Sequence, residues 1–142
     1  MSERTVRTLL IVAAVIHLAN GVWQFFAPGH FYETVATFGV RNDHFIRDIS
    51  TVFIALGIAL WLAAGRPSWR PAVLAVAVIQ YTVHLISHIV DVQMARPESL
   101  GWITIVLLAG PLALFVVLLR RSSGSDTGSR PPGEPPRGRD LA

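Results

Sequence analysis

The sequence predicts an all-α integral membrane protein, folded as an antiparallel four-helix bundle with both termini in the cytoplasm (N-in/C-in). Only 15% of its 142 residues are charged and 52% are hydrophobic, whereas soluble domains carry about 25% charged residues. The apolar residues are concentrated in four runs of about 20 residues, the length that crosses a hydrocarbon core of about 30 Å. Arginines stand mostly at the ends of those runs. These observations exclude a soluble globular enzyme and a disordered chain.

Turn-forming residues delimit the predicted helices, which lie near residues 8–27, 44–64, 71–94 and 100–119. The breaks between them fall at Pro28-Gly29, Gly65-Arg66-Pro67 and Arg96-Pro97. The first run is longer than the apolar region of a signal peptide, so we expect a retained helix. The four helices together form one predicted transmembrane domain, residues 1–121.

Two segments outside the long runs have their own signatures. The spacing of Phe31, Tyr32, Val35 and Phe38 predicts a short amphipathic helix on the outer leaflet, between the first two long helices. From Ser122 onward the chain is rich in Ser, Gly, Pro and Arg and has no apolar periodicity. Such a segment buries too little surface to offset its ordering entropy, so residues 122–142 are predicted to be a disordered cytoplasmic tail.

The arginines set the expected orientation in the cell membrane. Those at one end of the predicted helices are Arg4, Arg7, Arg66, Arg70, Arg120 and Arg121. The positive-inside rule places this end in the cytoplasm, which makes the chain a multi-pass plasma-membrane protein with cytoplasmic termini. The expected partners are the lipid bilayer and either another membrane protein or further copies of the chain.

The composition also excludes several kinds of site. The chain has no cysteine, so disulfides, thiolate nucleophiles, Cys-ligated zinc and iron–sulfur clusters are ruled out. It has no lysine, and its arginines form no continuous basic patch, so nucleic acid is not an expected partner.

Polar side chains occur inside the predicted spans and share helix faces. One face of the first helix carries His17, Asn20 and Gln24, and one face of the third carries Tyr81, His84, His88 and Asp91, while His44 and Asp48 open the second helix. Counted at about 1.5 Å per residue from the outer ends, His17 and His84 lie at a shared depth of about 15 Å. Ionisable groups in a membrane usually face a bundle interior. The pattern therefore predicts one polar pocket that is open to the outside and closed below by apolar residues.

Imidazole and carboxylate ligands make a metal ion or metal cofactor the first interpretation of this pocket, as a redox-linked component of the membrane. The predicted metal ligands are His84, His88, Asp91, His44 and Asp48, with Zn, Cu, Fe or Mn as the candidate ions. His17, Asn20 and Tyr81 are predicted to bind the cofactor. Haem is a variant of this hypothesis, with His17 and His84 as axial ligands.

Three alternatives stay open at this point. Histidine titrates near neutral pH, so the same residues suit a proton relay or a site for a polar headgroup such as a quinone. The polar residues could instead satisfy one another and only specify helix packing. In that case the chain is a non-catalytic accessory or structural subunit of a membrane complex. The sequence does not decide between an enzyme and a binding protein.

The first half of the chain resembles the DoxX-like small four-helix bacterial membrane proteins. The resemblance is carried by Asn20-Gly21, Phe26-Ala27-Pro28, Phe38-Gly39, Arg47-Asp48 and Leu56-Gly57. It implies the four-helix architecture and no particular site residues. The members that give this group its name are linked to quinone-coupled sulfur oxidation, which favours the quinone alternative.

Overall fold

The computed structural model describes residues 1–123, in which helices alternate with short turns and no β-strand occurs. Four of the helices are long and apolar enough to cross a membrane, which confirms the predicted membrane-length helices. The elements are α1 (Glu3–Phe26), α2 (Pro28–Val35), α3 (Asp43–Gly65), the 3-10 turn η1 (Pro67–Trp69), α4 (Arg70–Val90), the 3-10 turn η2 (Val92–Met94) and α5 (Glu98–Ser123).

The helix boundaries differ from the predicted ones in three places. The first helix begins at Glu3 rather than near residue 8, because the Ser2 hydroxyl caps it by accepting from the Thr5 backbone N–H at 3.1 Å. The third predicted helix was expected to reach residue 94, but α4 ends at Val90 and the turn η2 follows. The fourth continues to Ser123, past the expected end at residue 119. The rest of the predicted tail, residues 124–142, lies outside the described residues.

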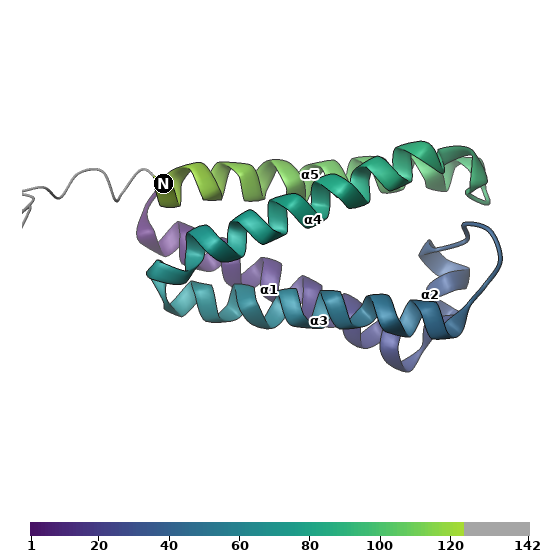
Figure 1. The fold of residues 1–142 in the computed structure, drawn as a ribbon, viewed down its shortest axis with the longest axis horizontal. Coiled ribbons are helices and arrows are strands. Elements are labelled where there is room, and N and C mark those ends of the chain that lie inside the picture. Colours follow the sequence, from purple (N-terminus) through teal and green to yellow (C-terminus); the bar gives the residue numbers. More distant parts are fainter. Residues whose placement is uncertain (124–142) are drawn as a thin grey trace, which may run out of the picture.

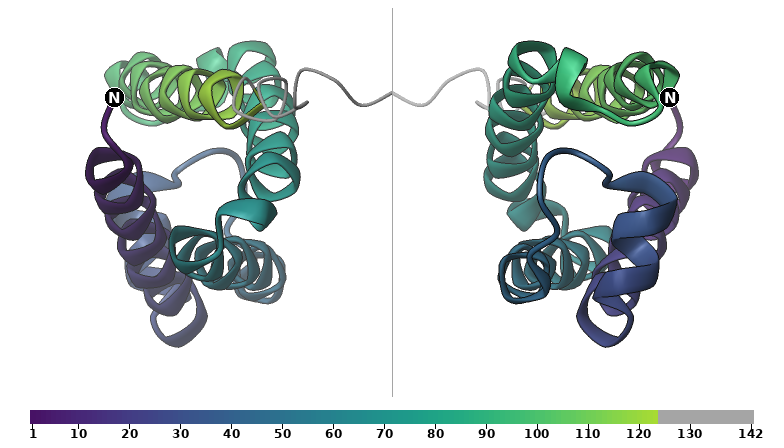
Figure 2. Two further views of the ribbon diagram at one scale, coloured as in Figure 1. Left: turned by 90° about the vertical axis from the view of Figure 1, so that its left-hand side faces the viewer. Right: turned by 90° about the vertical axis from the view of Figure 1, so that its right-hand side faces the viewer.

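The four long helices lie around a common axis in the order α1, α3, α4, α5 (Figure 2). Each long helix runs opposite to the next one along the chain (Figure 1). The arginine end, at the left of Figure 1, holds the start of α1, the turn η1 and the end of α5. The histidine end, at the right, holds α2, the connection 36–42 and the turn η2. A short helix is confirmed here as α2, but it ends at Val35, so Phe38 of the predicted helix lies beyond it.

The long helices are packed as two pairs, α1 with α3 and α4 with α5. Glycine lets the first pair approach closely, since a Cβ atom on Gly21 would lie 2.7 Å from Ile54 Cγ1 and 3.0 Å from the Ser50 carbonyl oxygen. The buried apolar core lies toward the arginine end and joins the two pairs. It includes Leu10, Ala14, Leu60, Leu74, Ala77, Phe115 and Leu118.

Arg70 joins three elements at the arginine end. Its guanidinium donates to both carboxylate oxygens of Glu3 in α1, at 2.8 and 2.6 Å. It also donates to the backbone carbonyl oxygens of Ala63 and Ala64, at 3.1 and 3.3 Å. These carbonyls belong to the last turn of α3, where a helix has no internal donors left. Arg70 is the first residue of α4, and its buried side chain therefore connects the end of α3 to the first turn of α1.

The connection 36–42 joins the two helix pairs at the histidine end. Phe38 forms an isolated β-bridge with Ala95, and the Arg96 backbone N–H donates to the Thr37 carbonyl at 3.0 Å. The Thr37 hydroxyl donates to the Arg96 carbonyl in return. The segment after α2 is thus fixed to the turn between α4 and α5, so the pairs are connected at both ends of the molecule.

A second arginine orders the approach to α3. Arg41 donates to both carboxylate oxygens of Asp43, at 2.6 and 2.9 Å, and to Glu33 of α2 at 3.5 Å. The hydrogen bond to the Asp43 carboxylate raises the pKa of the Arg41 guanidinium above its ordinary value. This cluster ties α2 to the first turn of α3.

Replacing Arg70 by methionine is expected to lower the free energy of unfolding by about 1–3 kcal/mol, because the buried Ala64 carbonyl oxygen loses its donor and the Glu3 carboxylate loses its partner. Thermal unfolding of the purified protein in detergent measures the change. Arg66→Met is the matched control, because Arg66 is exposed and forms no ion pair within residues 1–123. Equal losses in the two variants would contradict the role given to Arg70.

Candidate functional site

A hydrogen-bonded pair of side chains, His17 and Tyr81, lies in the middle of the molecule. His17 Nδ1 is 2.7 Å from the Ala13 carbonyl oxygen, and its Nε2 is 2.9 Å from the Tyr81 hydroxyl. A carbonyl oxygen only accepts, so Nδ1 carries the proton and donates to it. In the neutral ring Nε2 then accepts from the Tyr81 hydroxyl. Both nitrogens of this buried imidazole are therefore in use.

Aromatic rings enclose this pair. The His17 ring centroid lies 6.0 Å from that of Phe53 in α3 and 5.9 Å from that of Phe115 in α5. Phe115 also meets the Tyr81 ring at 5.3 Å. Each long helix thus contributes one ring to a cluster around the hydrogen bond, and only 3% of His17 is exposed. The polar pair is shielded on all four helices.

Two further histidines lie on the same side of α4, toward the histidine end. The His84 and His88 ring centroids are 4.8 Å apart. Phe53 meets His84 at 6.4 Å, and Phe38 of the connection 36–42 meets His88 at 4.9 Å, both nearly edge to face. A benzene ring therefore lies against each imidazole. Both histidines are half-buried.

The hydrogen bonds of His88 fix its tautomer. Its Nδ1 lies 3.2 Å from the Thr104 hydroxyl oxygen in α5. That hydroxyl donates its single proton to the backbone carbonyls of the preceding turn of α5, so it accepts from His88 Nδ1. His88 Nε2 then presents a lone pair. Within residues 1–123, neither this atom nor either nitrogen of His84 has a hydrogen-bond partner.

The structure does not bring the whole predicted metal-ligand set together. His44 faces Asp48 at 3.4 Å on an exposed part of α3, where an i, i+4 pair satisfies itself. Asp91 follows the last residue of α4 as its C-cap, because the helix ends earlier than expected. No group of three or more His, Asp or Glu side chains in residues 1–123 is arranged to hold a metal ion. His84 and His88 are the two predicted ligands whose imidazole rings lie side by side.

Two of the three predicted cofactor residues, His17 and Tyr81, contact each other, whereas Asn20 does not join them. His17 and Tyr81 are hydrogen-bonded to each other. His17 was expected to lie beside His84, at the same depth. Instead it contacts Tyr81, because Tyr81 lies about one helical turn closer to the arginine end and its long side chain extends to His17. Asn20 is half-buried and has no hydrogen bond to another described side chain. Gln24 is buried, and its amide nitrogen has no partner within residues 1–123.

Sequence reasoning missed the aromatic residues of the site. Phe53 and Phe115 belong to apolar runs, in which interior and lipid-facing residues have the same character. Phe38 was assigned to the short amphipathic helix and not to the site. A signal was available for Phe53, since its position near the middle of the second predicted helix matches the depth of His17.

One family matches this sequence. Residues 5–117, which include all of α3 and α4, most of α1 and α5, and well over half of the chain, match the family described as domain of unknown function DUF4345. The chain belongs to this family. No curated protein and no solved structure matches it.

Removing the Tyr81 hydroxyl is expected to destabilise the fold by about 1 kcal/mol, the usual size of a polar contact between membrane helices. Tyr81→Phe leaves His17 Nε2 buried without its donor, and thermal unfolding in detergent reports the loss. Tyr32→Phe is the control, because the Tyr32 hydroxyl donates to the Gly39 carbonyl on the exposed surface. A Tyr81→Phe protein as stable as the unmodified chain would show that the hydrogen bond does not hold the helix pairs together.

Proposed function

We propose that this member of the DUF4345 family is a multi-pass protein of the cell membrane, folded as an antiparallel four-helix bundle with its arginine end in the cytoplasm. Four membrane-length helices support the location. The charges support the orientation, because the described part of the arginine end has six arginines and only one acidic residue, Glu3. The histidine end then faces outward.

We further propose that the site on α4 binds the polar headgroup of a lipid-soluble small molecule, with a quinone as the candidate class. The observation that carries the proposal is the His84–His88 pair, whose free ring nitrogens lie beside two phenylalanine rings. A planar ring that bears carbonyl or hydroxyl groups suits such surroundings, because it can pack against benzene rings and hydrogen-bond to imidazole at once.

The protonation of the two histidines fits either form of such a headgroup. A neutral His84 offers one N–H donor, which suits a carbonyl oxygen. His88 Nε2 offers a lone pair, which suits a hydroxyl, since its Nδ1 donates to Thr104. The His17–Tyr81 pair lies deeper and uses its own nitrogens, so it forms the floor of the site. The resemblance to DoxX-like proteins points to the same ligand class.

A transition metal is the second candidate, and the short distance between the His84 and His88 rings favours it. These histidines supply two ligands, whereas catalytic zinc sites use three protein ligands and structural sites four. A metal would therefore need ligands from a substrate, from water or from another chain. Elemental analysis and a visible spectrum of the purified protein separate this candidate from the quinone.

Changing His88 to alanine is expected to weaken binding of a decyl-substituted benzoquinone by about tenfold, the equivalent of one hydrogen bond of about 1.4 kcal/mol. Isothermal titration of the detergent-purified protein measures the affinity. Stability should change little, because Thr104 keeps its backbone hydrogen bonds without His88.

His44→Ala is the control for this experiment, because His44 lies exposed at the same end and pairs only with Asp48. A benzoquinone that fails to bind the unmodified protein contradicts the proposal. So does a stoichiometric metal that is lost on changing His84 to alanine, which would establish the second candidate instead.

The orientation can be tested by cysteine labelling, because the natural chain has no cysteine. A cysteine at Ser68, in the turn η1, should resist a membrane-impermeant thiol reagent in intact cells. A cysteine at Glu98, at the start of α5, should react. The reverse pattern would show that the histidine end faces the cytoplasm.

A further inference from the structure

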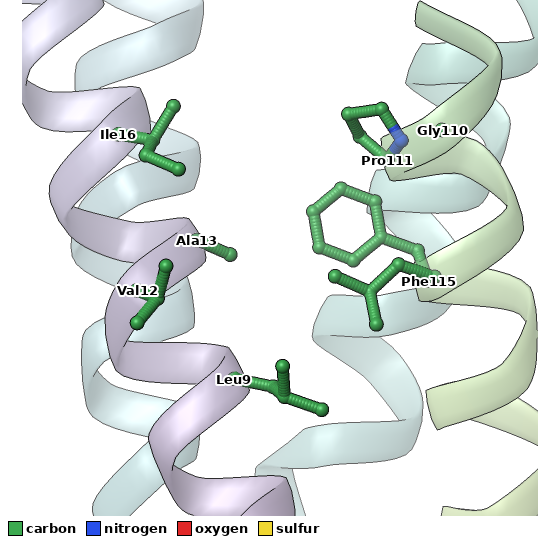
Figure 3. A pocket seen from close by; sticks show the side chains of 8 residues that line it. Leu9, Val12, Ala13, Ile16, Gly110, Pro111 and Phe115 are labelled. Carbon is green, nitrogen blue, oxygen red and sulfur yellow. The ribbon is translucent and has the colours of Figure 1, made fainter.

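An apolar groove separates α1 from α5. It lies on the other side of the molecule from the turn η1, which joins α3 to α4 (Figure 2). Figure 3 shows side chains of α1 on one wall facing those of α5 on the other. The groove has a volume of about 150 Å³ and exposes almost no polar atoms. It is lined by Leu9, Val12, Ala13, Ile16, Gly110, Pro111, Leu114 and Phe115.

The groove opens to the outside of the helix assembly. Ile16 on its α1 wall is 60% exposed, and Val12 is 49% exposed. On the α5 wall, a Cβ atom added to Gly110 would meet nothing within 4 Å. Because both helices are membrane-length, this opening faces hydrocarbon chains when the protein spans a bilayer.

The groove extends over most of the thickness of one leaflet. From Leu9 to Ile16 the wall extends about 10 Å at 1.5 Å per residue, which covers most of a half-core of about 15 Å. It begins near the arginine end, where a lipid headgroup would lie. The depth of the groove therefore matches the upper part of an acyl chain.

Polar residues continue both walls at the arginine end. On α5, Arg121 follows Leu114 by seven residues and Gly110 by eleven, so the three share one side of the helix. On α1, Thr5 precedes Leu9 by four residues, and its hydroxyl lies 2.8 Å from that of Ser2. Each wall therefore continues into polar residues at the arginine end, and the α5 wall continues into a cation.

The charge at this end is not neutralised within the described residues. Glu3 is the sole carboxylate there among residues 1–123, and both its oxygens accept from Arg70. Arg121 is exposed and forms no ion pair in that part of the chain. Arginine presents a planar set of donors that suits a phosphate group.

We propose that the groove between α1 and α5, with Arg121 at its end, binds one anionic phospholipid. The phosphate would contact Arg121, which continues the α5 wall, and one acyl chain would lie between the two apolar walls. This site needs the chain to span a membrane, but it does not depend on the histidine site or on its ligand.

Native mass spectrometry of the full chain in detergent, titrated with palmitoyl-oleoyl phosphatidylglycerol or phosphatidylcholine, tests the proposal. One phosphatidylglycerol should bind more tightly than phosphatidylcholine. Arg121→Gln should weaken that binding about fivefold, the equivalent of about 1 kcal/mol for one arginine near an anionic surface. Arg120→Gln is the matched control, since it removes the same charge from the neighbouring residue, which lies on another side of α5.

The groove is tested separately by Gly110→Leu, which fills it where a side chain meets no protein atom. This variant should lose the tight phosphatidylglycerol complex, whereas Ala109→Leu, on an adjacent exposed side of α5, should keep it. If Gly110→Leu does not fold, Ile16→Phe narrows the same groove from α1.

Three results would overturn the proposal. Equal losses from Arg120→Gln and Arg121→Gln would mean that the attraction is diffuse. Equal binding of the two lipids would remove the role of the headgroup. A change in oligomeric state on filling the groove, with lipid binding unaltered, would show that a second copy of the chain occupies it. Failure of benzoquinone binding leaves this proposal intact, because that result concerns only the site on α4.

Discussion

The hydrogen bond between His17 and Tyr81 links the two helix pairs in the middle of the molecule, where few other polar contacts join them. Within a membrane, apolar packing between helices gains little over contact with lipid, so a polar bond between helices specifies how they meet. Here the bond also consumes both nitrogens of His17. Phe53 and Phe115 pack around it, and Phe53 also lies against His84. The hydrogen bond and the proposed site on α4 are therefore connected through one phenylalanine ring.

The chain divides its polar residues between two tasks. Arg70, Arg41 and His17 are fully engaged by other residues, and each joins elements that are distant in sequence or direction. His84 and His88 retain free nitrogens in half-buried positions. Groups of the first kind maintain the fold, whereas groups of the second kind are able to bind a ligand. This difference is the physical basis for proposing a binding site on α4 and not at the deeper histidine.

Much of the fold follows from the sequence, because helices long enough to cross a membrane are marked by length, apolarity and flanking charge. The short helix α2 was likewise indicated by its spacing. The partners of individual polar residues were harder to predict. His17 pairs with Tyr81 because a long side chain reaches past one helical turn, which a count of depth ignores. Asp91 is the C-cap of α4, since the helix stops at Val90 and the turn η2 follows, and it completes no metal-ligand group within residues 1–123. His44 and Asp48 satisfy each other locally.

The bridge between Phe38 and Ala95 joins the two helix pairs at the histidine end. Helix pairs joined only at the arginine end, through η1 and Arg70, would be free to separate at the other end. Because they are joined at both ends, separation of the pairs at the histidine end is restricted. A lipid-soluble ligand of the proposed kind would then reach His84 and His88 from between the helices. The length of the connection 36–42, and not any residue of the proposed site, would govern entry from the aqueous side.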